Sequence, residues 1–208
     1  MKHKLSLITC LLFITWNVFG QSSASGEVFS NPVVVDSSST IMIPVAYDAG
    51  LFTSNKLALW GSYYANIIFY NFKTDSSKKL FEKNTYIENF NAYYTSSLYG
   101  KPQQKNRTSR WIFYKVKNLD HNKNNRIDSK DPSLLYVSDI YGNNLKCLTN
   151  ENENIEDIDI FEKQNFAFIK IQRDLNKDGN FDGEDKDYYY VKLDLVSFTF
   201  GRKIELKQ

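Results

Sequence analysis

Residues 111–137 read WIFYKVKNLDHNKNNRIDSKDPSLLYV, an apolar and aromatic run, an acidic polar connection and a second apolar run. The same order returns in residues 166–191, which read FAFIKIQRDLNKDGNFDGEDKDYYYV. β-branched and aromatic residues favour strands, whereas Asp, Asn and Gly favour turns and loops. Each stretch therefore predicts two antiparallel strands that are joined by a long acidic loop.

The acidic loops belong to a longer repeat, because Asp120 and Asp174 are 54 residues apart and the flanking runs repeat with them. A turn and a short strand are expected after each pair, at 141–144 with 145–148, and at 196–199 with 202–206. A third copy without an acidic loop is expected upstream, with strands at 57–61, 67–72 and 78–81, a turn at 74–77, and residues 61–66 in place of the loop.

The rest of the chain also favours strands, for example at Val33–Val35 and Ile41–Val45. No long stretch has a helical period, although short helical turns are conceivable near Tyr93–Leu98 or Ile155–Ile158. The polar residues 100–109 are expected to form a flexible loop. The fold class expected is therefore all-β, with about three antiparallel units stacked side by side.

The N-terminus has the pattern of a secretory signal peptide, with a basic start, an apolar run at Leu5–Trp16 and small residues near Gly20. A signal anchor or a lipidated Cys10 are the alternatives. We expect a signal peptide at 1–20, a flexible lead at 21–31 and a single domain at 32–208. No later apolar stretch is long enough for a transmembrane helix.

Charge and cysteine usage limit the classes of function. Cleavage after residue 20 would remove Lys2 and Lys4, and the 26 basic residues would fall to 24, equal to the 24 acidic ones. A neutral chain has no electrostatic reason to bind nucleic acid or an anionic membrane. Only Cys147 would remain, which excludes an intramolecular disulfide and predicts a buried thiol.

The loop at 174–185 has the spacing of a calcium-binding loop, with oxygen side chains at positions 1, 3, 5, 9 and 12. Gly179 at position 6 permits a sharp turn, and Phe181 at position 8 is expected to point into the sheet. The expected ligands are the side chains of Asp174, Asn176, Asp178, Asp182 and Asp185 and the backbone carbonyl of Asn180. The alternative is a solvated hairpin loop without metal.

The loop at 120–131 has the same spacing but a weaker pattern, with three ligand carboxylates rather than four and Asn125 in place of glycine. Asn tolerates the left-handed conformation, so the turn can still form. Fewer carboxylates predict a lower calcium affinity. The expected ligands are the side chains of Asp120, Asn122, Asn124, Asp128 and Asp131 and the backbone carbonyl of Arg126.

Enzyme motifs are few. His121 is the one histidine outside the signal segment, and its place in an acidic loop argues against a catalytic triad or a zinc site. The sequence has no phosphate-binding loop, dinucleotide glycine pattern or nucleophile elbow. A hydrolase that uses a pair of carboxylates stays open, because any two acids can meet in space.

The stretch Leu134–Thr149, LLYVSDIYGNNLKCLT, resembles the blade signature of TolB-like and WD-repeat-like β-propellers. This resemblance implies a propeller-like fold, but propellers usually close with four to eight blades and about three fit here. A partial or open propeller, or a homodimer that completes one ring, is therefore expected. The acidic loops resemble the EF-hand-like loops of dockerin and thrombospondin-type repeats, in which Asp replaces Glu at position 12.

These observations predict a secreted or periplasmic protein, of bacterial type, with one or two structural calcium ions. The expected role is non-enzymatic binding or scaffolding, with a protein or a glycan as partner. A glycan-binding module would require a row of exposed aromatic side chains. A carboxylate-dependent hydrolase would require a deep acidic cleft away from both loops.

Overall fold

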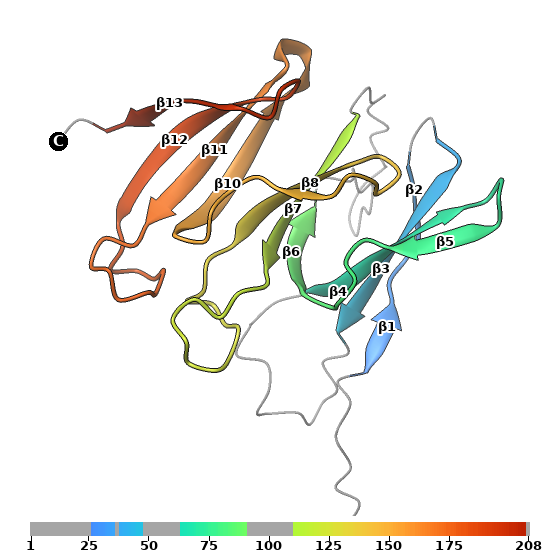
Figure 1. Ribbon diagram of the computed structural model, residues 1–208, viewed down its shortest axis with the longest axis horizontal. Coiled ribbons are helices and arrows are strands. Elements are labelled where there is room, and N and C mark those ends of the chain that lie inside the picture. Colours follow the sequence, from blue (N-terminus) through green and yellow to red (C-terminus); the bar gives the residue numbers. More distant parts are fainter. Residues whose placement is uncertain (1–25, 36–37, 48–62, 91–109, 207–208) are drawn as a thin grey trace, which may run out of the picture.

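The computed structural model describes residues 26–35, 38–47, 63–90 and 110–206, and within them it is an all-β protein of two antiparallel sheets (Figure 1). The described residues contain no α-helix, and a single turn of 3-10 helix, η1, spans Glu162–Gln164. No helix in this part of the chain is long and apolar enough to cross a membrane. The all-β prediction is confirmed.

The first sheet has nine strands, in the order β1-β3-β4-β6-β7-β8-β9, with β2 paired to β3 and β5 paired to β4. Its strands are β1 (Glu27–Phe29), β2 (Val33–Val34), β3 (Thr40–Tyr47), β4 (Tyr64–Asn71), β5 (Ser76–Lys79), β6 (Tyr86–Phe90), β7 (Trp111–Lys117), β8 (Leu134–Asp139) and β9 (Lys146–Cys147). The second sheet has four strands in chain order: β10 (Glu153–Phe161), β11 (Phe166–Arg173), β12 (Asp187–Asp194) and β13 (Phe200–Glu205).

The strand β7 buries both of its faces, so it lies in the middle of the molecule. Ile112, Tyr114 and Val116 pack with buried residues of β3 and β4, on one side. Phe113 packs with buried residues of β11 and β12, on the other side. Successive side chains of a strand point to opposite faces, so one strand can join two cores. The hydroxyl of the fully buried Tyr114 is 2.7 Å from Ser138 Oγ, which satisfies its polar group.

Several sequence predictions need correction. The Ile155–Ile158 stretch is part of β10 and not a helical turn, because Ile155 and Ile158 pair with β11 and extend its inner face. The segment 21–31, expected as a flexible lead, includes a strand, since Glu27–Phe29 pair with β3. The predicted substitute loop at 61–66 is wrong in its second half, because Tyr64–Asn66 belong to β4.

The strand predicted at 57–61, the turn at 93–98 and the loop at 100–109 lie outside the described residues, as does the segment 1–20. In the sheet β4 pairs with β3 along most of its length, with β5 in a hairpin and with β6 at Tyr64↔Ile87. The repeat also has strands that the sequence pattern missed, because β6 precedes β7 and β10 precedes β11 in the sheets. Each acidic loop thus joins the second and third strands of a four-stranded meander.

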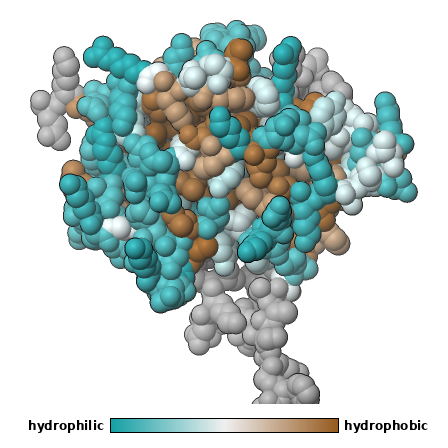
Figure 2. All heavy atoms as spheres, viewed as in Figure 1, coloured by the Kyte–Doolittle hydropathy of each residue, from teal (hydrophilic) through white to brown (hydrophobic). Residues whose placement is uncertain are grey.

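Hydrophobic residues also reach the surface in the middle of the view in Figure 2, with hydrophilic residues at its sides. The exposed large apolar side chains of the described residues are Val28, Phe29, Val34, Phe72, Tyr141, Phe161, Leu175, Tyr190, Val196, Phe200, Ile204 and Leu206. Single exposed apolar residues are normal, but a contiguous group of them on one element often marks an interaction surface.

The turn between β8 and β9 requires glycine at position 142. Gly142 has a φ of +70°, and a Cβ there would lie 2.5 Å from two ring atoms of Phe69. We expect Gly142→Ala to lower the free energy of unfolding by about 2–4 kcal/mol, from left-handed strain and from displacement of the buried ring. Denaturant unfolding measures the loss. Gly183→Ala, where a Cβ meets nothing within 4 Å, is the matched control and should change it by less than about 0.5 kcal/mol.

Candidate functional site

The two acidic loops occupy the same place in the two sheets. The loop at 120–131 lies between β7 and β8, and the loop at 174–185 lies between β11 and β12. In Figure 1 they lie next to each other at one end of the strands. The strand pairs that flank them are in continuous antiparallel register, from Val116↔Leu134 and from Arg173↔Asp187. The loops are therefore held at their bases by paired backbone.

Both loops have the same backbone conformation at positions 4 and 6. Lys123 and Asn125 have φ angles of 59° and 66°, and Lys177 and Gly179 have φ angles of 61° and 78°. Left-handed residues at two alternate positions coil the chain tightly and turn the intervening backbone N–H groups inward. Two loops with different sequences thus share one turn geometry, which agrees with the spacing of their oxygen side chains.

In the second loop, side-chain oxygens accept hydrogen bonds from backbone N–H groups two or more residues ahead. Asn176 Oδ1 accepts from Asp178 N at 3.0 Å, and Asp178 Oδ1 accepts from Asn180 N at 2.8 Å. Asp182 Oδ1 accepts from Glu184 N at 3.0 Å. These bonds hold positions 3, 5 and 9 in a curved arrangement before any ligand binds.

Asp174, at position 1 of the second loop, has one satisfied and one unsatisfied oxygen. Its Oδ2 accepts from Gly179 N at 2.9 Å. Its Oδ1 is buried from solvent and has no hydrogen-bond partner. A buried carboxylate oxygen without a donor is costly, by about 1–3 kcal/mol or more for a charged group. A cation at this atom would remove the cost.

In the first loop, the corresponding Asp120 has both oxygens occupied, by Asn124 N at 3.0 Å and by Asn125 N at 2.8 Å. Asn124 Oδ1 accepts from Arg126 N at 2.9 Å, and Asn122 Oδ1 accepts from Asn124 N at 3.1 Å. Asn125 N and Gly179 N make the same bond at position 6, and the additional bond from Asn124 N leaves no oxygen of Asp120 without a partner.

The carboxylates at position 12 are the most deeply buried parts of both loops. Asp131 is 0% exposed and accepts from His121 N and Asp128 N, both at 2.8 Å. Asp185 is 1% exposed and accepts from Leu175 N at 2.8 Å. In each loop the last carboxylate therefore bonds to the backbone at position 2 and closes the loop. An aspartate is long enough to do this because the loop ends approach each other.

A different side chain anchors position 12 in each loop. Gln172 Nε2 donates to the carbonyl oxygen of Asp185 at 2.8 Å in the second loop. In the first loop Lys117 Nζ donates to the carbonyl oxygen of Asp131. Lys117 is buried, and desolvation lowers its pKa from the ordinary lysine value, while the nearby Glu88 carboxylate opposes the shift. A cationic anchor beside the first loop opposes the binding of a second cation.

The two loops also contact each other, which joins the two sheets. Asn122 Nδ2 donates to Asn180 Oδ1 at 2.9 Å, and Phe181 N donates to the carbonyl oxygen of Lys130 at 2.8 Å. Lys130 Nζ lies 3.5 Å from Asp182 Oδ2. The two loops are therefore one paired unit. The repeat spacing alone placed them in equivalent positions but did not predict that they touch.

Phe181 at position 8 is buried, and its ring centroid lies 5.8 Å from that of His121 in the other loop. His121 is half-buried against the neighbouring loop. The Cys147 thiol is also half-buried and donates to the carbonyl oxygen of Thr149 at 3.3 Å. These groups are occupied by packing and hydrogen bonding within the fold.

The loops match calcium in residue type, spacing and backbone, but their carboxylates are not gathered around one point. Among the described residues, no three His, Cys, Asp or Glu side chains lie close enough together to hold a metal ion. The carboxylates instead accept from the loop backbone. Amide hydrogen bonding to Asn180 keeps the pKa of Asp178 below its ordinary value, so this carboxylate is charged at neutral pH. Calcium would need the loop to contract around it.

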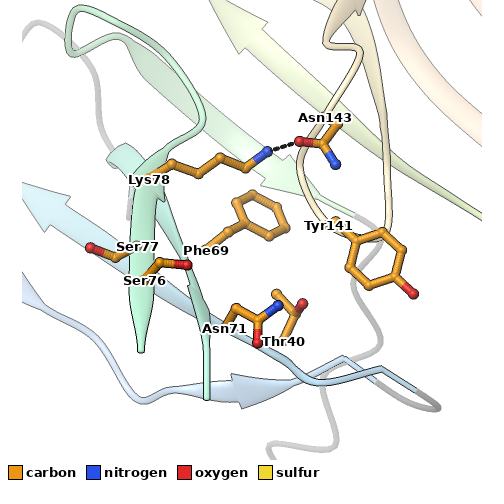
Figure 3. Close-up of a pocket in the computed structure, with 8 residues that line it drawn as sticks. All are labelled: Thr40, Phe69, Asn71, Ser76, Ser77, Lys78, Tyr141 and Asn143. Carbon is orange, nitrogen blue, oxygen red and sulfur yellow. Dashed lines mark hydrogen bonds between the residues drawn. The ribbon is translucent and has the colours of Figure 1, made fainter. Parts of the chain in front are cut away.

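A separate pocket of about 200 Å³ lies between the β4–β5 hairpin and the turn after β8 (Figure 3). Figure 3 shows Lys78 reaching across it to Asn143, to which it donates a hydrogen bond, above the ring of Phe69. Its lining is Thr40, Phe69, Asn71, Ser76, Ser77, Lys78, Tyr141 and Asn143. The pocket contains no carboxylate, and it is smaller than the roughly 300–1,000 Å³ typical of ligand sites.

No protein-family model matches this chain, and no curated protein matches it at significant similarity.

Proposed function

We propose that the paired loops bind calcium and that the ions hold the two sheets together. The observation that carries the proposal is the buried, unpartnered Oδ1 of Asp174 at position 1 of the second loop. Calcium prefers six to eight oxygen ligands in a flexible loop, and residues 174–185 supply four carboxylates, one amide oxygen and one carbonyl at the spacing it requires. Because the loops touch, ions there would stabilise the contact between sheets as well as each hairpin.

The second loop is proposed as the tighter site. It has four ligand carboxylates, an unpaired oxygen and the neutral anchor Gln172. The first loop has three ligand carboxylates, and two cations lie near it, since Lys117 bonds to Asp131 and Arg126 lies 3.8 Å from Asp128. Fewer negative and more positive charges lower the affinity for a divalent cation.

The fold is proposed to be a partial β-propeller of three blade-like units. The support is the repeated meander: β6–β9 and β10–β13 each have four antiparallel strands, with the acidic loop between the second and third. The β3–β5 strands, with core residues packed against β7, form the third unit. This arrangement is consistent with the TolB-like signature at 134–149, whose strand, glycine turn and short strand are β8, Gly142 and β9.

The proposed role is non-enzymatic binding or scaffolding outside the cytoplasm of a bacterium, where calcium is plentiful. The support is the signal-like segment at 1–20, the neutral remaining chain and the calcium-type loops. The hydrolase alternative has no support from the pocket of Figure 3, which lacks a carboxylate. The glycan alternative requires an exposed aromatic row, and the described part of the chain has aromatic side chains exposed on β10–β13.

Isothermal titration of the chelator-treated protein with calcium is the direct test. We expect the wild type to bind one ion tightly and a second more weakly. Asp174→Asn should weaken the tight site by about tenfold or more, because it removes one charge and the unpaired oxygen. Asp120→Asn should affect the weaker site only.

Glu184→Gln is the matched control. Glu184 is at position 11, so this substitution removes one negative charge from the same loop without removing an expected ligand. Its calcium affinity should stay within about threefold of the wild type. Equal losses in Asp174→Asn and Glu184→Gln would mean that the loop attracts cations by net charge alone. Absence of any binding heat, with no shift in the protein's amide NMR spectrum on calcium addition, would contradict the proposal.

A further inference from the structure

The sheet β10–β13 has one covered and one open face. Its inner face carries Ile169, Val191 and Leu193, all buried in the core shared with β7 and β8. Its outer face carries five aromatic side chains on three strands. We call this group the outer aromatic face, and it consists of Phe161, Phe166, Phe168, Tyr188 and Tyr190.

Four of the five rings of the outer aromatic face form one connected cluster, and the fifth ring, Tyr188, lies 4.6 Å from Lys170 Nζ. The centroid of Phe166 lies 5.0 Å from that of Phe161 and 5.2 Å from that of Phe168. Phe168 in turn lies 6.3 Å from Tyr190. Phe161 is 40% exposed and Tyr190 is 39% exposed. A connected group of half-exposed rings on one face of a sheet is typical of an interface, since scattered apolar residues would not be in contact.

The charges on the outer face are separated by strand. Asp157 and Asp159 project from β10, because they pair with Lys170 and Phe168 and so share their face. The basic side chains come from the other strands: Lys170 from β11, Lys192 from β12 and, by alternation with Ile204, Arg202 from β13. Asp194, the last residue of β12, also shares this face, and its carboxylate accepts from the backbone of the following turn. The β10 edge of the face is therefore acidic, the β13 edge is basic, and two lysines lie among the rings in the middle.

We propose that the outer face of β10–β13 binds the same face of a second copy of this chain, around a two-fold axis parallel to the strands. This axis places β10 of one copy over β13 of the other, and β11 over β12. The registers Asp159↔Phe168 and Phe168↔Lys192 put these residues at one level along the strands. On β13 this level is the irregular stretch that contains Arg202. Asp159 of each copy therefore faces Arg202 of the other.

The same operation has a second consequence for the middle of the interface. Because Phe168↔Lys192 and Lys170↔Tyr190 are register pairs, Lys192 of one copy lies over Phe168 of the other, and Lys170 over Tyr190. Both are cation–π arrangements, and Lys192 and Lys170 already lie 4.8 Å and 4.6 Å from rings of their own chain. A two-fold axis perpendicular to the strands would instead place the acidic β10 over itself, and like charges opposite each other are unfavourable.

The area of the outer face of β10–β13 sets the expected affinity of the dimer. Four strands about 4.8 Å apart and eight residues long, at about 3.3 Å per residue, cover roughly 500 Å² on each copy. The total of about 1,000 Å² is at the lower limit for a specific interface. We therefore expect a reversible dimer whose population rises with concentration. This dimer differs from a ring of stacked units, in which this face would meet the β3–β5 side of the other copy.

The test is sedimentation velocity over a range from about 1 to 500 μM, with calcium present, on the full chain without its signal-like segment. We expect a monomer–dimer equilibrium in the wild type. Asp159→Arg and Arg202→Asp should each raise the dissociation constant by about tenfold or more, because each change creates two symmetric like-charge contacts. The double variant Asp159→Arg/Arg202→Asp restores opposite charges and should recover wild-type association to within about threefold.

Phe161→Ser should also weaken association, because it removes an exposed ring from the interface. Phe72→Ser, at a comparably exposed phenylalanine that is outside β10–β13, is the matched control and should leave the equilibrium unchanged. Circular dichroism spectra equal to that of the wild type verify that each variant is folded.

Three results would overturn the proposal. The first is a wild-type protein that stays monomeric at every concentration. If that monomer also bound to a glycan array and Phe161→Ser abolished the binding, the outer aromatic face would be assigned to glycans. The second is a dimer that none of the charge or ring substitutions weakens. The third is a double variant that associates as weakly as the single variants. That result would assign the contact to a different arrangement, such as the ring.

Discussion

Removal of calcium is expected to lower the melting temperature of this protein by roughly 5–10 °C for each occupied loop. A ligand at about 100 times its dissociation constant stabilises the folded state by about 2.7 kcal/mol. For a domain of this size, about 1 kcal/mol shifts the melting temperature by about 2–4 °C. In the absence of the ion, the carboxylates within each loop repel one another, and the Oδ1 atom of Asp174 stays buried without a partner.

Thermal melts followed by circular dichroism measure the shift, in millimolar calcium, after chelation and after calcium is restored. Magnesium at the same concentration is the control for ionic strength, and it should restore only part of the stability. Hydrogen exchange should show that β11 and β12 lose protection first after chelation, because they flank the loop with the tighter proposed site. A melting curve that chelation leaves unchanged would contradict a structural role for calcium.

Replacement of Asp131 by alanine is expected to lower the free energy of unfolding by about 2–5 kcal/mol even in the presence of a chelator. The fully buried carboxylate accepts hydrogen bonds from His121 N and Asp128 N, both at 2.8 Å. Alanine would leave both donors unsatisfied, at about 1–3 kcal/mol each. Urea unfolding with chelator present measures this cost separately from any loss of a calcium ligand.

Asp131→Asn distinguishes hydrogen bonding from packing at this position. Its amide oxygen can still accept one of the two hydrogen bonds, so we expect about half of the alanine effect. Glu151→Ala, at an exposed acid outside both loops, should change the free energy of unfolding by less than about 0.5 kcal/mol. If Asp131→Ala were as mild as this control, the hydrogen bonds of the carboxylate would not close the first loop.

Much of the local structure follows from the residue pattern. The runs of β-branched and aromatic residues in Trp111–Lys117 and Phe166–Arg173 predict strands, and both are strands in the structure. The oxygen spacing after Asp120 and Asp174 marks two tight loops, and both loops have left-handed residues at positions 4 and 6. These features depend on neighbours within about twelve residues, so they can be inferred before the fold is known.

The missed features depend on partners that are distant in sequence. The Ile155–Ile158 stretch allows a helical turn by itself and becomes a strand because β11 offers it a hydrogen-bonded edge. Lys117 is the last residue of β7, and only the packed structure shows that its ammonium group donates to the backbone of Asp131. Local propensity is weak compared with tertiary pairing in such cases.

The sequence by itself determined that this is an all-β chain with two acidic loops of matching side-chain spacing, because strand-forming runs and spacing within a loop are local properties. Only the tertiary structure decided that Asn122 and Asn180 join the two loops into one unit across the sheets. It also decided that the rings of β10–β13 lie on an open face. A period of two residues tells which side chains share a face of a strand, but the packing of sheets decides which of those faces is covered.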